Sequence, residues 1–172
     1  MVVKKLSGTD RRSIGLADEV AEQIAADQAL FDEVVQAMFL DDPVIRMRAA
    51  DAVEKASRRC PERLVPHKEA LLGSLAESGQ QEVRWHVAQM LPRLRLSPPE
   101  KARACAVVKS WLRDKSVIVR VHALTAFAEL ALGDENLEEE ALRLLLHAVQ
   151  AGAPAEKARA RKLLKLHEKQ QK

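Results

Sequence analysis

The chain has 172 residues, of which 47% are hydrophobic, five are Phe or Trp and none is Tyr. This composition, rich in Ala, Leu, Glu, Lys and Arg, favours helices over a sheet and fits a single domain spanning residues 1–172. The formal net charge is +3, with −3 over residues 1–86 and +6 over residues 87–172. No secretory signal or apolar run of about 18 residues is present, which predicts no membrane span. Cys60 and Cys105 form no C-x-x-C pair, which is typical of a reduced, cytoplasmic protein.

Apolar periodicity predicts nine helices joined by short links. The first eight residues are expected to be a frayed terminus, and a cap helix weakened by Gly15 follows from Thr9. Pro61 and Pro66 bracket a turn that has room for one short helical piece. The expected helices are 9–26, 28–40, 43–58, 62–77, 80–95, 99–113, 116–132, 137–151 and 154–169.

Several helix boundaries carry their own chemical signals. Asp27 and Asp42 are expected N-caps, and Pro43 suits the first helical turn because its φ is fixed and its missing N–H is not needed there. Pro92 removes a backbone hydrogen bond and is expected to kink or end its helix. Gly133 is a candidate left-handed C-cap.

One sequence motif, or phrase, seen most clearly in residues 114–127, recurs along the chain. In 114–127, Val119, Ala123, Ala126 and Phe127 fall on one helical face. Copies of the phrase are centred on basic residues separated by 38, 36 and 37 positions: Arg46, Arg84, Arg120 and a divergent Lys157. A steady period in this range predicts stacked helix pairs that share one continuous core.

These copies resemble the HEAT repeat. The matching residues are Ile45-Arg46 with Ala49-Ala50, Val83-Arg84 with Val87-Ala88, and Val119-Arg120 with Ala123-Leu124. The resemblance implies an all-α, right-handed solenoid in which the second helix of each pair lines a concave face. Its units would be a tail and cap helix over 1–26, then repeats over 27–60, 61–97, 98–133 and 134–172.

The resemblance also implies a structural ladder of Arg46, Arg84 and Arg120. In the family this arginine often bonds a turn aspartate, and Asp114, six residues before Arg120, is the match here. We therefore predict that Asp114 contacts a basic residue of an inner helix. The last helix is expected to be a cap, because Glu156 and its basic neighbours replace residues that are small or apolar in earlier copies.

Residues that follow the basic positions are predicted to face outward from the inner helices. Three of them in succession are apolar and lie beside a column of Arg and His, which would make a groove. Such a groove could hold a protein segment, which predicts a non-enzymatic protein-interaction scaffold. The alternatives are that Trp85 packs between repeats and that the histidines are ordinary surface residues. The predicted partner-binding residues are Met47, Arg48, Trp85, His86, Val121 and His122.

The alternative function is duplex nucleic-acid binding, with a HEAT-like DNA-repair glycosylase as the enzymatic version. Residues 154–172 carry seven Lys or Arg against two Glu, and Arg159, Arg161 and Lys162 are candidate anion-binding residues. His86 and His122 are expected to lie too far apart to share a metal ion. The sequence has no H-E-x-x-H, G-x-S-x-G or phosphate-binding glycine loop, so we predict no catalytic residues, metal or cofactor.

Overall fold

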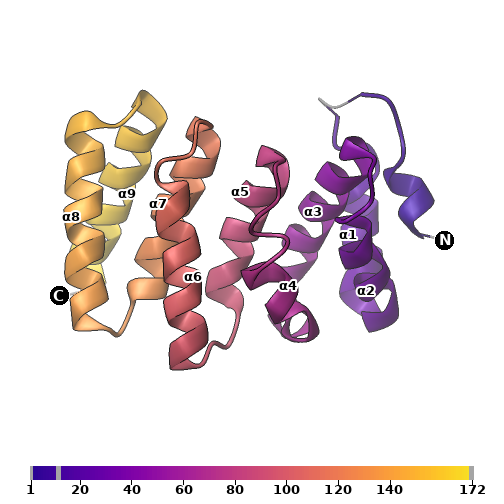
Figure 1. The fold of residues 1–172 in the computed structure, drawn as a ribbon, viewed down its shortest axis with the longest axis horizontal. Coiled ribbons are helices and arrows are strands. Elements are labelled where there is room, and N and C mark those ends of the chain that lie inside the picture. Colours follow the sequence, from indigo (N-terminus) through magenta and orange to yellow (C-terminus); the bar gives the residue numbers. More distant parts are fainter. Residues whose placement is uncertain (1, 11–12, 171–172) are drawn as a thin grey trace. The chain divides into compact units, whose positions relative to one another are not determined.

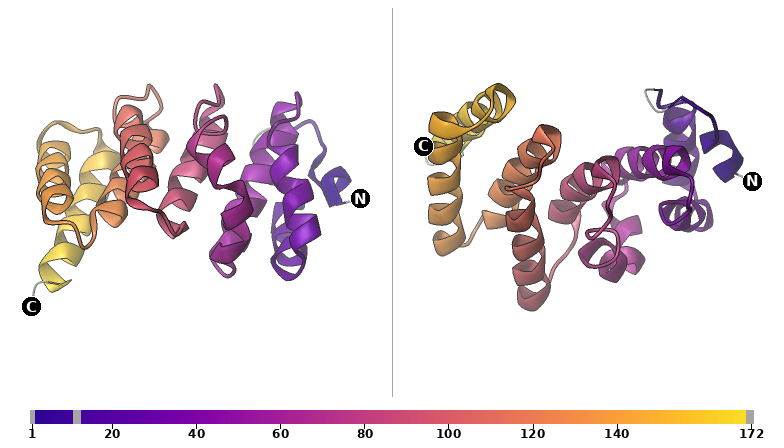
Figure 2. Two further views of the ribbon diagram at one scale, coloured as in Figure 1. Left: turned by 60° about the horizontal axis from the view of Figure 1, so that its bottom comes forward. Right: turned by 45° about the horizontal axis from the view of Figure 1, so that its top comes forward.

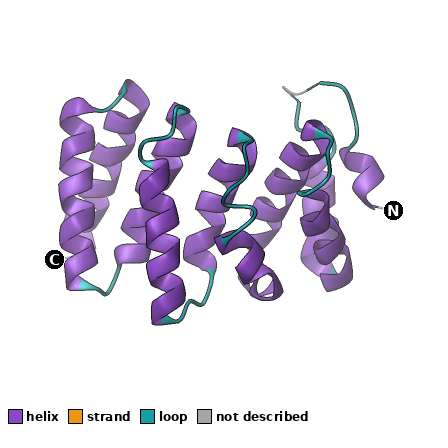
Figure 3. Ribbon diagram, viewed as in Figure 1, coloured by secondary structure: helices purple, strands orange, loops and turns teal. Residues whose placement is uncertain are grey.

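The structure, a computed structural model, describes residues 2–10 and 13–170, and every regular element in these ranges is helical (Figure 3). The all-helical prediction is confirmed for them. None of the described helices combines the length and the apolar character needed to cross a bilayer. The α-helices of the described residues are α1 (Ala17–Ala26), α2 (Gln28–Ala37), α3 (Pro43–Ser57), α4 (Lys68–Leu72), α5 (Gln81–Met90), α6 (Pro98–Trp111), α7 (Val117–Ala131), α8 (Glu135–Ala151) and α9 (Pro154–Gln170), and the 3-10 helices are η1 (Val2–Leu6), η2 (Pro61–His67) and η3 (Leu91–Arg93).

Local capping explains where several helices begin and end. The Asp27 carboxylate accepts from the backbone N–H of Ala29 at 2.8 Å, and the Asp42 carboxylate accepts from that of Val44 at 2.8 Å. At α6, the backbone N–H of Ser97 donates to the Glu100 carboxylate at 2.7 Å. Helix α5 passes into η3 at Leu91, directly before Pro92, as the sequence predicts.

Two glycines and one proline also shape the elements. Gly133 follows α7 with φ +77°, in the left-handed region that the sequence predicts for it. Gly15 has φ +57°, so α1 begins at Ala17 and not at Thr9. The helix expected over 62–77 is also wrong: η2 contains Pro66, and α4 ends at Leu72, before Gly73.

Of the first eight residues, which were expected to fray, the described residues 2–8 do not form a frayed terminus. Residues Val2–Leu6 make η1, which packs against α1, α2 and α3. Leu6 is fully buried and Val2 is buried. Apolar burial therefore holds this segment in place. Its five residues are too few to show an apolar repeat in the sequence.

The chain divides into two compact units, Met1–Arg95 and Leu96–Lys172. In unit 1, α3 packs against α1, α2 and α5 (Figure 1). Its core includes Phe31, Ile24 and Leu64, each fully buried. Because α3 is covered from several sides, much of its circumference is inaccessible to solvent.

In unit 2, the neighbouring pairs are α6 with α7 and α8 with α9, and α7 also packs against both α8 and α9. Figure 2 shows α8 and α9 side by side in both views. Leu124, Leu145, Ala148 and Ala160 form a buried cluster where α7, α8 and α9 meet. The buried Ala160 lets α9 approach α7 and α8 closely.

Candidate functional site

Three arginines, Arg46, Arg84 and Arg120, repeat one contact at the starts of α3, α5 and α7. Each donates through Nη1 to the main-chain carbonyl oxygen six residues earlier, at 2.7, 2.7 and 2.6 Å respectively. A charged donor aimed at a carbonyl makes a stronger hydrogen bond than a neutral one, so each contact fixes the turn before its helix. The three accepting residues are Leu40, Ser78 and Asp114.

Two of these arginines also reach the next helix pair of their own unit. Arg46 Nε donates to the Gln80 side chain at 2.8 Å. In unit 2, Arg120 donates through Nε and Nη2 to the Glu156 carboxylate, with both distances 3.0 Å. These hydrogen bonds, and one from the Ala153 N–H, hold the pKa of Glu156 below its usual value despite burial. Glu156 is buried and bonded, whereas four basic residues of the same helix are exposed.

The contact between Asp114 and Arg120 runs through the main chain of Asp114. The Asp114 carboxylate accepts from the Ser116 N–H at 2.8 Å, in a local turn before α7. The turn aspartate and the helix arginine thus both stabilise the connection between α6 and α7. Arg46, Arg84 and Arg120 are occupied by protein groups and do not present an open cationic track.

Arg48 does not face outward, and its predicted place in a partner-binding groove is wrong. Its side chain is buried, and its guanidinium donates to four carbonyl oxygens of the N-terminal segment, at 2.6 to 3.1 Å. Cβ atoms added at Gly8 and Gly15 would lie 2.6 and 2.9 Å from atoms of this guanidinium. Two glycines therefore let the backbone close around Arg48. The carbonyls belong to Leu6, Ser7, Asp10 and Ser13.

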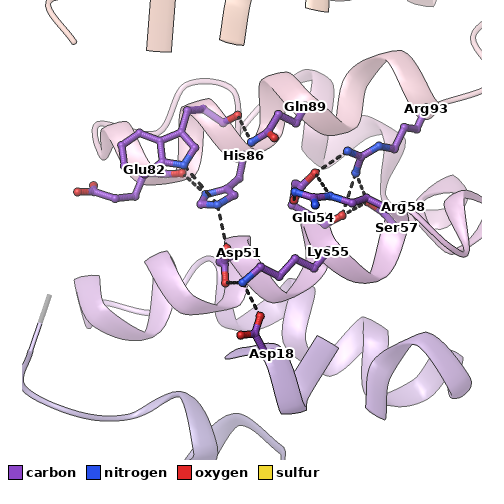
Figure 4. A network of polar contacts seen from close by, with 11 residues as sticks. Asp18, Asp51, Glu54, Lys55, Ser57, Arg58, Glu82, His86, Gln89 and Arg93 are labelled. Carbon is purple, nitrogen blue, oxygen red and sulfur yellow. Dashed lines mark hydrogen bonds and ion pairs between the residues drawn. The ribbon is translucent and has the colours of Figure 1, made fainter. Parts of the chain in front are cut away.

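His86 is also buried, contrary to the prediction that it faces outward. Its Nδ1 lies 2.7 Å from the Glu82 carbonyl oxygen and must donate to it (Figure 4). Its Nε2 lies 3.4 Å from an Asp51 oxygen and 3.3 Å from Trp85 Nε1. Trp85 is only partly buried, whereas Met47 is buried.

The six residues predicted to line one groove are thus divided between the two units. Of those in unit 1, only Trp85 retains substantial exposure. Val121 and His122 lie on α7 in unit 2, where both are partly buried. We find no exposed groove built from the unit 1 members.

The most deeply buried charge is Glu54, which sequence reasoning missed. Its carboxylate receives hydrogen bonds from Arg58 at 3.0 and 2.6 Å and an ion pair from Arg93 (Figure 4). Burial alone would raise the pKa of Glu54, but the two arginines hold it below its usual value. Arg93 also donates to the Ser57 hydroxyl at 2.7 Å. The whole group is internally satisfied, which identifies it as a structural link between α3 and η3.

A neighbouring group joins α1 to α3. Lys55 Nζ contacts the Asp18 and Asp51 carboxylates at 2.6 and 2.7 Å (Figure 4). Burial alone would raise the pKa of Asp51, but hydrogen bonds from His86 and Lys55 hold it below its usual value. No cluster of three His, Cys, Asp or Glu residues with metal-binding geometry occurs within residues 2–10 and 13–170.

The basic residues of α9 differ from all these engaged groups. Six Lys or Arg side chains lie on this helix, and none makes a hydrogen bond or ion pair with another described residue. Four of them are exposed and share one helical face. This face, called the basic face below, consists of Arg161, Lys162, Lys165 and Lys169.

An apolar pocket of about 210 Å³ opens in unit 2, beside α9. Leu132 and Leu166 lie at this pocket and are 50% and 48% exposed. The pocket was not predicted from the sequence. The apolar pattern of α8 and α9 shows which residues can pack, but it does not show where their packing leaves a gap. Its apolar lining comes mainly from Ala128, Ala141, Leu142, Leu145, Leu163 and Leu166.

Comparisons with known proteins give a fold likeness. No protein family matches the sequence, and no curated protein matches it. The crystal structure of an engineered protein from the Northeast Structural Genomics Consortium matches with a TM-score of 0.62 and 18% identity, over 95% of this chain and 76% of that chain. At this identity the match bears on the fold alone.

Proposed function

We propose that this chain is a non-enzymatic protein-interaction module with a HEAT-like arrangement of helix pairs, and that it binds a protein segment through the apolar pocket of unit 2. The pocket is the observation that carries the proposal. It replaces the groove around Trp85 as the binding site, because Met47, Arg48 and His86 are buried.

The size and lining of the pocket favour one large apolar side chain as its occupant. A volume of about 210 Å³ is smaller than a typical site for a drug-sized ligand. Interfaces commonly place a single apolar or aromatic anchor in such a hollow. Leu132 and Leu166, each about half exposed, supply apolar surface that the anchor would remove from water.

Nucleic-acid binding remains the second candidate, and the basic face favours it. Four exposed cations on one helix could follow phosphate groups. However, Arg46, Arg84 and Arg120 bond protein groups, so these three arginines are not available to phosphate groups. The pocket lining is mostly Leu and Ala and contains no Phe, Tyr or Trp, the larger rings on which bases commonly stack.

A peptide selection tests the leading proposal. A displayed library of random peptides is selected on the full chain, and the affinities of the selected peptides are measured by fluorescence anisotropy. We expect the selected peptides to share one large apolar residue and to lose affinity when it is changed to Ala. Selected peptides without such an anchor, or the absence of any selected peptide, would contradict the proposal.

Two leucines of nearly equal exposure provide a matched pair of variants. Leu166→Ser changes a pocket residue that is 48% exposed, whereas Leu146→Ser changes a residue on α8 that is 47% exposed and outside the pocket lining. We expect Leu166→Ser to weaken peptide binding about tenfold, or about 1.4 kcal/mol. Leu146→Ser should leave it unchanged. Equal effects of the two substitutions would exclude the pocket as the binding site.

A further inference from the structure

The basic face of α9 borders the apolar pocket. Leu166 lies at the pocket, and Lys162 and Lys169 stand four residues before it and three after it. Residues at these spacings are neighbours on a helix surface, so a lysine flanks Leu166 on each side along the helix. With a rise of about 1.5 Å per residue, the two lysines are separated by about 10 Å along the axis.

The two acidic residues that line the pocket each have a partner within the protein and make no ion pair with this face. Glu138 accepts a hydrogen bond from the Gly133 N–H at 2.8 Å, at the end of α7. Glu129 also has a partner within the protein. The basic face, in contrast, makes no ion pair with any other residue that the structure describes. On α9 beside the pocket, four exposed cations outnumber one exposed carboxylate, Glu168, so the net charge that this helix offers a ligand is positive.

The basic face also carries internal repulsion, which the single exposed carboxylate of Glu168, three residues after Lys165, offsets only in part. Arg161 and Lys165 are four residues apart, as are Lys165 and Lys169. Like charges at this spacing oppose helix formation. A ligand that brings negative charge to this side of α9 would relieve the repulsion, and complementary charge would also speed its association.

From these contacts we infer the chemistry of the partner, and the inference rests on the proposed function. We propose that the pocket and the basic face together bind an acidic segment of a partner protein. One large apolar side chain of the segment enters the pocket, and Asp or Glu residues close to it in the segment lie against Lys162, Lys165 and Lys169.

A peptide fits both features better than a nucleic acid does. A phosphate backbone would satisfy the lysines but leave the apolar pocket empty. An acidic segment with an apolar anchor satisfies the charges and also buries the exposed part of Leu166. The observations therefore favour a protein partner, and nucleic-acid binding becomes one outcome of the test.

The composition of the peptides selected on the full chain is the first readout. We expect Asp and Glu to be enriched within four residues of the apolar anchor, relative to the unselected library. We also expect affinity to fall as NaCl is raised from about 0.05 to 0.5 M, because salt screens exposed charges. Pocket-dependent peptides that are neutral or basic would overturn this inference and leave the proposed function intact.

Two double variants with the same change in net charge give the second readout. Lys162→Gln with Lys165→Gln removes two charges from the basic face. Arg113→Gln with Lys115→Gln removes two exposed charges from the turn before α7, where neither side chain makes a hydrogen bond or ion pair with a described residue. We expect the first variant to weaken binding about fivefold and the second to leave it within about twofold. Equal effects would mean that net charge alone acts, which would overturn the inference.

A 20-base-pair DNA duplex is the competing probe. We expect it to bind more weakly than the selected peptides and to be insensitive to Leu166→Ser. DNA that binds more tightly, and that loses affinity on Lys162→Gln with Lys165→Gln, would assign the basic face to nucleic acid and overturn the inference. If Leu166→Ser weakens the binding of no selected peptide, both the proposed function and this inference are refuted.

Discussion

Glu54 and Arg48 show how single charged residues are accommodated inside unit 1. Glu54 is 1% exposed and is balanced by two arginines, whereas Arg48 is 5% exposed and is balanced by carbonyl oxygens. An unpaired buried charge would cost several kcal/mol, so each must be fully bonded. Neither residue could be assigned from sequence, because a helical wheel cannot reveal which neighbouring segment covers a given face.

Replacing Glu54 by Gln should destabilise unit 1. We expect the free energy of unfolding at pH 7 to fall by about 3 kcal/mol, at the low end for a broken buried ion pair, because Arg58 can turn toward solvent. The folded pKa of Glu54 lies below the ordinary value of 4.5. Its contribution is therefore complete above about pH 4.5 and lost as the pH falls through the folded pKa. Urea unfolding of both proteins from pH 7 to pH 3 should show their difference shrinking on the acid side.

Gly15→Ala should also destabilise the protein. The glycine has φ +57°, where a side chain costs about 1–2 kcal/mol, and the added Cβ would lie 2.9 Å from Arg48 Cζ. Gly79→Ala is the control, since its Cβ would meet nothing within 4 Å. Chemical denaturation that shows equal stability for the two variants would refute the close fit around Arg48.

At the scale of elements, cap and proline signals located most helix starts correctly. Asp27 and Asp42 each stand one residue before an observed helix. These signals are local, so they can be read without knowledge of the fold. The prediction of one helix over 62–77 was wrong because it followed the apolar spacing and gave too little weight to Pro66. The structure has the 3-10 helix η2, which contains Pro66, followed by the short helix α4.

The two adjacent aspartates before α3 permit a sharp test of capping. Asp42→Ala should lower the free energy of unfolding by about 1 kcal/mol, because it removes the acceptor for two backbone N–H groups. Asp41→Ala, one residue earlier, should have almost no effect, because only its main-chain carbonyl bonds Arg46. The measurement is urea unfolding followed by circular dichroism. A larger loss for Asp41→Ala would reverse the assignment.

At the scale of the whole molecule, the repeat period predicted a helical chain but not its division into two compact units. The phrase around Arg46, Arg84 and Arg120 recurs across both units, so sequence self-similarity alone gives no reason to separate them. The division depends on how densely side chains pack between particular helices. The candidate site was equally hard to predict, because a pocket is a gap in packing that no residue pattern encodes directly.

Each unit contains one tryptophan, which allows its stability to be followed separately. Trp85 lies in unit 1, and Trp111 is buried in unit 2. Deleting residues 154–172 removes α9 and uncovers Leu124 and Leu145, so unit 2 should melt at a lower temperature. In single-tryptophan variants, Trp85→Phe and Trp111→Phe, we expect the fluorescence transition of Trp111 to shift and that of Trp85 to stay. A deletion that abolished all helical circular dichroism would contradict this expectation.

The closure of the N-terminal segment over Arg48 has a consequence for the order of folding. The four carbonyl oxygens come from residues 35 to 42 positions before the arginine, whereas α2 and α3 are joined by a short link. Closing a long loop costs more entropy than closing a short one, so the α2–α3 hairpin should form first. Before the N-terminal segment packs against α3, water must solvate the Arg48 guanidinium. The guanidinium loses this water only when the segment covers that side of α3. Pulsed hydrogen exchange should then show amides of α3 protected before those of η1.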